Sequence, residues 1–461
     1  MAMLRSAGSR RTRFGVTFTT AAIAATLMLS LFAGPVAARS AAVVHVGCRS
    51  GVGDTSKLIK SIKDANQRPR PVVTILYLAD CTYTLHGAQS FPSFGPNGLP
   101  TVTSHLVIRG QGATIRRGTG AGRFRLIGVG ATGVLKLVDL TLTNGAARNG
   151  QPGSATLGGN GTNGTKGDDG GAIYNQGRVG LTNVILADNY AGKGGAGGAG
   201  VGLDAADGAS PGANGDDASN VEGGWGGNGG DGGAIYNAGT LTIKSSTLQN
   251  NYAGDGGLGG EADGGKGGDG AAGAPGGNGG YGGGATGGQG GDGGRAGAIF
   301  STGTLTVNDT TIDSNYAGNG ADVGTAVAGM GGHGADDNGV GGHGGGANSW
   351  FSGSGGEGGA VYLSSGVANF TNDTISNNVA GDSGNASATG GAGGDGGCSG
   401  TGGSGGGSVA SAGPAGAIVG IVNDGATLHV TSVTFTGGAG GVQGGATSTG
   451  GVGGAGGSAC V

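Results

Sequence analysis

The stretch GGAIYNAGTLTIKSSTLQNNYAG, residues 232–254, decides the fold. It contains three short runs of alternating side chains: Ala-Ile-Tyr, Leu-Thr-Ile and Thr-Leu-Gln. Leu241 and Ile243 alternate with threonines, the period of two that is typical of a strand with one buried face. Gly and Asn separate the runs and suit the corners between strands. Three short strands in each turn of chain predict one coil of a right-handed parallel β-helix, and the many Gly and β-branched residues disfavour an α-helix.

The same motif recurs along the chain, with copies that start at Gly170, Gly232, Ala296, Gly358 and, in a divergent form, Ala415. One coil cannot bury its apolar face alone, so the coils must stack, about 4.8 Å apart. Stacking predicts an all-β solenoid over residues 96–461. The apolar residue that follows Gly-Ala in each copy should then form one internal ladder, made of Ile173, Ile235, Ile299, Val361 and Ile418.

Two further columns follow from the same register. Asn accepts the left-handed backbone of a sharp corner, and stacked amides can bond along the axis. We therefore expect a structural ladder of Asn189, Asn251, Asn315 and Asn378, with ligand binding by this row as the alternative. Tyr190, Tyr252 and Tyr316 follow the first three asparagines, and they predict an aromatic stack or a partly exposed stripe that binds sugars.

Long Gly-rich inserts separate the coils at residues 193–231, 255–295, 319–357 and 382–414, and a Gly-rich tail follows the last coil. They have few apolar side chains to offset the conformational entropy of ordering, which is about 1 kcal/mol per residue or more. The first prediction is therefore mobile loops on one side of the β-helix. The alternative is extended polyglycine-II strands, because Gly lets backbones approach closely.

Composition excludes several classes of protein. The chain has 461 residues, of which 123 are Gly and only 10 are Pro, and Gly does not recur strictly at every third position, so the chain is not a collagen. The formal net charge of −4 excludes a basic nucleic-acid-binding protein.

The N-terminus predicts a secretory signal peptide over residues 1–38. Arg5, Arg10, Arg11 and Arg13 precede an apolar stretch, and Val36-Ala37-Ala38 offers small residues for cleavage. A retained membrane anchor is the alternative. No second apolar span of membrane length follows, so we expect an extracellular or cell-surface protein.

Residues 39–95 predict a capping region. Residues 58–66 have helical spacing after a possible N-cap at residues 54–56, and strands are expected at residues 72–78 and 81–85. A helix across the end of a β-helix would hide its first edge strand.

Four cysteines, Cys48, Cys81, Cys398 and Cys460, suit an oxidising destination. They allow three pairings, of which the local one, Cys48–Cys81 with Cys398–Cys460, is the simplest. No spacing of Cys or His suggests zinc.

Several segments resemble a known group of proteins. The order of residues 60–66, 81–85, 97–104, 108–115 and 140–145 is similar to secreted bacterial right-handed β-helix proteins with a CSLREA-type N-terminal region. The GGAI copies resemble the polymorphic outer-membrane-protein repeat family. The resemblance implies a parallel β-helix outside the cell and is weak for activity.

Enzymatic and metal-binding alternatives rest on a few residues. Paired carboxylates would carry glycoside hydrolysis, but His333 and His343 lie in Gly-His-Gly sequences inside an insert, on either side of Asp336-Asp337, in the wrong order for such enzymes. Asp188, Asp313 and Asp373 are too scattered for a calcium-dependent lyase. Calcium is a possible cofactor through GGNGGDGG-type runs that contain Asp231, Asp269 and Asp292, although the apolar residue that such a motif requires is missing.

The sequence therefore predicts a secreted or cell-surface β-helix without enzymatic activity, with a structural or adhesin-like role. The alternative is a carbohydrate-active β-helix enzyme or a glycan-binding module. The expected partner is a surface glycan or a protein, and not a nucleic acid.

Overall fold

The computed structural model describes residues 41–69 and 71–458. The signal sequence predicted over residues 1–38 and Cys460 therefore lie outside the described residues. Residues from Ala41 onward form one compact unit. No helix within the described part of the chain is long and apolar enough to cross a membrane.

The unit is a right-handed parallel β-helix, as predicted. Its main sheet has 17 strands, and of the pairings between strands in the described residues only β2 with β3 is antiparallel. The first column of this sheet contains β1 (Ala41–Val46), β4 (Val73–Leu78), β6 (His105–Arg109), β9 (Val134–Thr143), β12 (Arg178–Ala187), β16 (Thr240–Lys244), β21 (Thr304–Asn308), β26 (Val367–Thr371) and β31 (Thr427–Thr431). The second contains β2 (Cys48–Arg49), β3 (Val52–Gly53), β5 (Thr82–Leu85), β7 (Thr114–Arg117), β17 (Thr247–Gln249), β22 (Thr311–Asp313), β27 (Thr374–Ser376) and β32 (Thr434–Thr436).

A six-stranded sheet forms another side of the β-helix, and it contains the strand of each GGAI motif. Its strands are β8 (Ile127–Val129), β11 (Ile173–Asn175), β15 (Ile235–Asn237), β20 (Ile299–Ser301), β25 (Val361–Leu363) and β30 (Ile421–Asn423). Ile173, Ile235, Ile299 and Val361 are register partners and fully buried.

The prediction that Ile418 is the last member of the internal ladder is wrong. The register partner of Val361 is Ile421, and Ile418 is 44% exposed. The divergent copy that starts at Ala415 lies three residues too early, in the segment that leads into the coil. Ile421-Val422-Asn423 matches Ile173-Tyr174-Asn175 better, so in this divergent copy the Asn marks the register and Gly-Ala does not.

Helix α1 (Thr55–Gln67) caps the N-terminal end of the solenoid, as expected from the sequence. The Asp54 side chain accepts a hydrogen bond from the Lys57 backbone N–H at 2.9 Å, which is an N-cap. The helix buries Leu58, Ile62 and Ala65 and contacts β1, β5 and β6. The predicted disulfide Cys48–Cys81 is confirmed and ties β2 to the start of β5. Cys398 is half-buried, and its predicted pairing with Cys460 stays a prediction.

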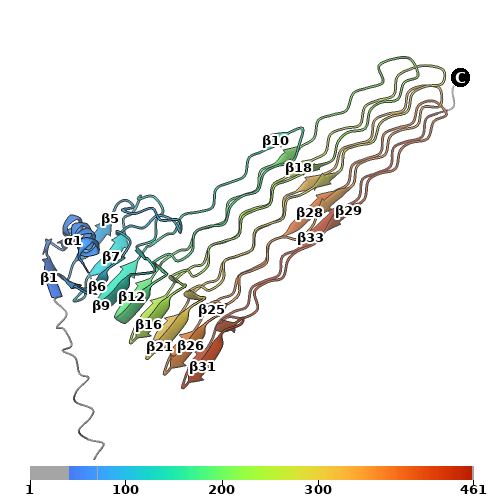
Figure 1. Ribbon diagram of the computed structural model, residues 1–461. Helices are drawn as coiled ribbons and strands as arrows, with labels where there is room; N and C mark the ends of the chain where they lie inside the picture. Colours follow the sequence, from blue (N-terminus) through green and yellow to red (C-terminus); the bar gives the residue numbers. More distant parts are fainter. Residues whose placement is uncertain (1–40, 70, 459–461) are drawn as a thin grey trace, which may run out of the picture. The chain divides into compact units, whose positions relative to one another are not determined.

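The Gly-rich inserts are ordered, which corrects the expectation of mobile loops. Each insert forms an outgoing arm and a return arm, and arms from successive coils run side by side (Figure 1). Outgoing arms cover residues 147–158, 191–208, 253–271, 317–335, 380–397 and 439–457. Return arms cover residues 160–170, 213–232, 277–296, 339–358 and 400–416. The first pair of arms and the last outgoing arm were missed, because residues 146–170 are less rich in Gly and the tail reads as featureless.

Short strands interrupt the arms and share a small core of Ala and Val. In the outgoing layer they are β10 (Thr156–Leu157), β13 (Gly200–Val201), β18 (Ala262–Asp263), β23 (Ala326–Val327), β28 (Ala386–Thr389) and β33 (Ala446–Thr449). In the return layer they are β14 (Val221–Glu222), β19 (Ala285–Thr286), β24 (Ala347–Ser349) and β29 (Ser408–Ala410).

Candidate functional site

The arms follow a three-residue rule that determines where every side chain points. Gly194 donates its N–H to Asp255 in the next outgoing arm at 2.8 Å, and Gly195 donates to Thr165 in the return layer at 2.9 Å. Lys193, the third residue, points outward. The pattern of one bond within the layer, one bond between the layers and one outward side chain then repeats, as in polyglycine II. This is the arrangement that the sequence offered as the alternative.

Glycine is required at positions such as Gly194 and Gly195 because another backbone approaches too closely there for a side chain. A Cβ atom on Gly195 would overlap the carbonyl oxygen of Gln151, and one on Gly194 would overlap that of Gly227. Hydrogen bonds between backbones therefore supply the cohesion that apolar side chains supply in the coils. The entropy argument for mobile loops neglected these bonds.

Outward Asn and Asp side chains satisfy the remaining N–H in many triplets. The Oδ1 atom of Asn149 accepts from the Lys193 N–H at 3.0 Å, one coil further along the chain. The same contact recurs from Asn163 to Trp225, from Asn228 to Asp292 and from Asp382 to Val442. An Asn or Asp at the outward position of a Gly-rich arm is thus a sequence signal of this architecture.

This rule also places the residues considered for calcium. One Oδ1 atom each of Asp231, Asp269 and Asp292 accepts a backbone N–H from the following coil, at 2.8–2.9 Å. Throughout the described residues, no group of three or more His, Cys, Asp or Glu side chains is placed to hold a metal ion.

The residues considered for hydrolysis follow the same rule. His333 Nδ1 accepts the Asp395 N–H at 3.0 Å, and His343 Nδ1 accepts the Ser404 N–H at 2.8 Å, so both histidines replace an Asx acceptor. They lie in opposite layers, and Asp336 and Asp337 lie at the tip between the two arms. The structure does not join them into a catalytic pair.

The coil carboxylates also occupy structural positions. Asp373 is buried and accepts the N–H groups of Thr310 and Thr371 at 2.9 Å. Asp313 accepts from Ser376 and Asn377, and Asp188 occupies a left-handed corner. The three residues belong to different coils.

The four predicted ladder asparagines lie in one buried column. Asn189, Asn251 and Asn315 each donate their Nδ2 to the Oδ1 atom of the next asparagine, the last of them to Asn378, at 2.9–3.0 Å. Each of these Oδ1 acceptors also takes a backbone N–H of the coil before it. A second column that the sequence analysis missed joins Asn175 to Asn237 and Asn237 to Ser301, although its first two members stand inside the GGAI motif itself.

The predicted tyrosine column is a stack. The ring centroids of Tyr190, Tyr252 and Tyr316 are 4.9 and 4.6 Å apart, with planes within 5° of parallel. The rings therefore cover one another's faces and present their edges to a groove of about 410 Å³. Lys193, Asp255, Asn319 and Asp382 also line this groove. Covered faces disfavour the stacking of sugar rings on these tyrosines.

A second stack and a charge network join the coils to the arms. Phe94, Tyr174, Tyr236, Phe300 and Tyr362 stack in succession. Arg125 lies over Phe94 and Tyr174, and Arg295 lies over Phe300 and Tyr362, with the guanidinium carbon 4.7–5.4 Å from each ring centroid. These contacts hold both guanidinium groups at the root of the return arms.

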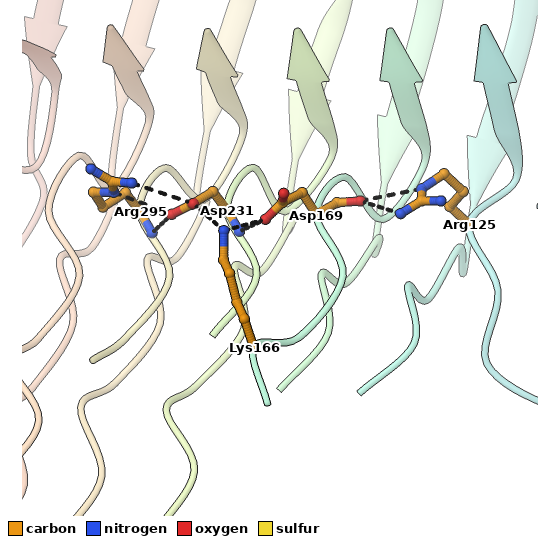
Figure 2. A network of polar contacts seen from close by, with 5 residues as sticks. All are labelled: Arg125, Lys166, Asp169, Asp231 and Arg295. Atoms are coloured by element: carbon orange, nitrogen blue, oxygen red, sulfur yellow. Dashed lines mark hydrogen bonds and ion pairs between the residues drawn. The ribbon is translucent and has the colours of Figure 1, made fainter. Parts of the chain in front are cut away.

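Figure 2 shows the charged side chains in a row across successive coils, with Lys166 between the carboxylates of Asp169 and Asp231 and an arginine at each end. Lys166 Nζ lies 2.8 Å from Asp169 Oδ1 and 2.7 Å from Asp231 Oδ2, and Arg295 Nε lies 3.2 Å from Asp231 Oδ1. At the other end, Arg125 donates to the backbone oxygen of Asp169 at 2.8 Å. The network borders a cavity of about 620 Å³ that is also lined by Glu357.

Burial and charge compete in this network. Burial would raise the pKa of Asp231, but the positive charges of Lys166 and Arg295 outweigh it and hold that pKa below its usual value. Burial dominates at Asp169, and its pKa is raised. Burial opposes the charged form of Lys166, yet the two carboxylates raise the pKa of Lys166. Burial lowers the pKa of Arg125 to about 10. Since every member has a partner inside the network, its evident role is structural.

Comparisons with known proteins add little to the geometry. No family description and no curated protein matches this chain. Among solved structures, it is similar to a family GH82 iota-carrageenase from A. fortis at 11% identity, with a TM-score of 0.20; the match covers 74% of this chain and 55% of the carrageenase. It is also similar to PfbA, a surface adhesin of Streptococcus pneumoniae, at 11% identity with a TM-score of 0.23, over 85% of this chain and 96% of PfbA. Scores this low carry no argument about activity.

The fold and its contacts define the class of protein: a parallel β-helix whose coils extend into two ordered layers of polyglycine-II arms.

Proposed function

We propose that this chain is an extracellular or cell-surface protein that binds other molecules through the flat faces of its arms, without catalysis. One observation carries the proposal: the arms are hydrogen-bonded layers in which each third side chain points outward. Such layers are a rigid display surface, whereas the loops expected from the sequence would not be.

The return layer presents aromatic and apolar side chains to solvent. Trp225, Tyr281, Phe351 and Val409 are 52–55% exposed. Exposed aromatic residues that are held by a rigid backbone are typical anchors of binding surfaces, because little conformational entropy is lost when they bind. This favours the return layer as the binding face.

The extracellular part of the proposal is supported by the signal-like N-terminal sequence and by the Cys48–Cys81 disulfide. Among the described residues, the carboxylates and histidines considered for catalysis accept a backbone or side-chain bond in the coils or arms or lie at an arm tip, apart from Asp188, which occupies a coil corner. Hence a binding role fits these residues better than hydrolysis does.

The test compares the two layers. The chain is screened against glycan arrays and intact cell surfaces, and a return-layer variant (Trp225→Ala, Tyr281→Ala) is compared with an outgoing-layer variant (Leu258→Ala, Met330→Ala) of similar exposure. We expect the first variant alone to lose binding. Equal binding by both variants, or release of a cleaved product from any array glycan, would contradict the proposal.

A further inference from the structure

The three stacked tyrosines of the groove are held at a fixed spacing by their backbone. Tyr190 and Tyr252 form a parallel bridge, and so do Tyr252 and Tyr316. The Tyr252 N–H donates to Asn189, and the Tyr252 carbonyl oxygen accepts from Ala191, both at 2.9 Å. The same two bonds attach Tyr316 to the coil before it. Each ring therefore stays opposite the next one for as long as the coils remain stacked.

The ring geometry brings phenol groups of successive coils together. The centroids lie 4.9 Å apart between Tyr190 and Tyr252 and 4.6 Å apart between Tyr252 and Tyr316, and the planes are within 5° of parallel. The carbon atoms of one ring thus lie close to those of the next. Tyr252 has a phenol neighbour on both of its faces.

The hydroxyl groups of this stack have no bond that the fold requires. Tyr362, in the second stack, donates its hydroxyl to Asp424 at 2.8 Å. The hydroxyls of the three groove tyrosines have no hydrogen-bond partner among the described residues. The second stack also uses Phe94 and Phe300, so stacking itself does not need a hydroxyl. The shared feature that packing leaves unexplained is therefore the phenol chemistry.

The phenols are accessible and keep their protons. All three rings line the groove of about 410 Å³, and Tyr190 is 38% exposed, so a small oxidant can reach them. Burial is the main cause that raises the pKa of Tyr190 and of Tyr252. Both phenols are therefore protonated at neutral pH, and oxidation must remove a proton together with each electron.

We propose that the stack of Tyr190, Tyr252 and Tyr316 is a site of oxidative modification, at which a one-electron oxidant of the peroxidase class couples two successive rings into dityrosine. Each of the two phenols gives up one electron and one proton. The two phenoxyl radicals form a carbon–carbon bond between ring carbons next to their hydroxyls, and the hydrogen on each of these carbons moves to the phenol oxygen. One hydrogen peroxide takes up the two electrons and two protons and becomes two water molecules.

The fixed stack favours coupling within one chain. Two reacting groups that are held side by side need no encounter, so their reaction becomes an intramolecular step. Tyr281 on the return layer is more exposed, but its ring stacks on His343 and not on a tyrosine. The new bond would join two coils in the middle of the β-helix, whereas the Cys48–Cys81 disulfide crosslinks its cap.

The experiment treats the full chain with a peroxidase and hydrogen peroxide at low protein concentration. We expect dityrosine fluorescence and a chain mass lower by two hydrogen atoms. After unfolding and digestion, the crosslinked peptides should join Tyr252 to Tyr190 or to Tyr316. The variant Tyr252→Phe keeps the ring but leaves the other two phenols two coils apart, so most of the fluorescence should be lost.

Two variants serve as matched controls. Tyr281→Phe removes an exposed phenol outside the stack, and Tyr236→Phe removes a phenol that stacks on Tyr174 in the second column. Both should couple as the wild type does.

Circular dichroism checks that the variants are folded. If Tyr252→Phe fails to fold, Tyr190→Phe with Tyr316→Phe replaces it, because it leaves Tyr252 without a phenol neighbour, and the same loss is expected. A wild-type chain that forms no dityrosine under conditions that couple free tyrosine overturns the proposal. So does unchanged fluorescence in the folded variant, and so do crosslinks that join separate chains or only tyrosines outside the stack.

Discussion

At the scale of single residues, the arms depend on the absence of side chains. Gly257 lies in an outgoing arm. Its N–H donates to Gly227 and its carbonyl oxygen accepts from Gly291, and both partners lie in return arms. A Cβ atom on Gly257 would overlap the carbonyl oxygen of Gly195, whereas one on Gly407 would meet nothing. A comparison of the two positions therefore tests whether Gly is needed for close packing or is merely frequent in the arms.

We predict that Gly257→Ala destabilises the chain by about 3 kcal/mol, because the backbones must move apart to admit the methyl group. Gly407→Ala is the matched control and should change stability by less than about 0.5 kcal/mol. Denaturant unfolding measures both. Equal effects would mean that the layers are not closely packed.

The charge network gives a prediction for pH. The pKa of Asp231 is lowered in the folded chain, so Asp231 stabilises the fold fully above about pH 4, its unfolded value. This stabilisation is lost as the pH falls through the folded pKa. Asp231→Asn should therefore cost about 2 kcal/mol at pH 7 and much less in acid.

Asp292→Asn is the control, because both substitutions keep an Oδ1 acceptor for the next coil but Asp292 lies outside the network. Unfolding free energies between pH 7 and pH 3 make the comparison. A cost for Asp231→Asn that does not change with pH would show that the ion pairs contribute nothing.

At the scale of elements, each arm is held by its neighbours rather than by a core of its own. An arm inside the stack bonds to arms on both sides and to the opposite layer, and the arm at residues 439–457 has a neighbour on one side only. The position of an arm therefore determines its contribution to stability.

We predict that deletion of residues 255–295 strongly destabilises the chain, because it removes the acceptors of Gly194 and Gly197 and the partners of Gly223 and Gly226. Deletion of residues 439–458 should cost far less. Thermal unfolding compares the two deletions. If the first deletion is tolerated as well as the second, the arms are independent of one another.

Protease resistance tests whether the arms are ordered without changing the sequence. The arms should be cut as slowly as the coils, because their backbone N–H groups are bonded. This resistance should persist with a chelator, since backbone and Asx contacts need no metal. Rapid cleavage within residues 255–271 would contradict the structure, and chelator-dependent cleavage would indicate calcium.

The cap gives the last prediction at this scale. Cys48–Cys81 closes a loop with a sequence separation of 33. In the chain-entropy account, losing such a crosslink costs about 3 to 4 kcal/mol. Cys48→Ser with Cys81→Ser should therefore raise hydrogen exchange in α1 and β1 and leave β21 and β26 unchanged. Uniform exchange along the stack would show that the cap and the coils unfold together.

At the scale of the whole molecule, the sequence predicts the part of the fold that uses side chains. Alternating Leu241 and Ile243, the corner asparagines and the N-cap Asp54 each carry a local signal, and the coils, the ladder and α1 follow from them. The arms are held by backbone hydrogen bonds between segments about 62 residues apart, as from the Gly194 N–H to the Asp255 carbonyl oxygen. Composition alone does not reveal such bonds, so the sequence does not distinguish ordered Gly-rich arms from disordered loops.

The candidate binding surface could not be foreseen for the same reason. Trp225 and Tyr281 are single aromatic residues inside Gly-rich text, and only the three-residue rule places both on one layer. The shifted register at Ile418 has a related cause, because Gly and Ala occur at so many positions that a Gly-Ala pair locates a strand poorly.

The three-residue rule has a consequence for the chemical lifetime of the protein. In a flexible chain, an Asn followed by Gly deamidates readily, because the Gly nitrogen attacks the amide carbon of the Asn side chain and closes a succinimide ring. The arms contain several such pairs, and their Gly N–H groups donate to the neighbouring arm, as Gly150 does to Lys193, Gly164 to Trp225 and Gly320 to Asp382. The Asn Oδ1 atoms are held by the next coil as well. Attack therefore requires the arm to open first, so a sequence that would age quickly as a loop is preserved for as long as the layers stay closed.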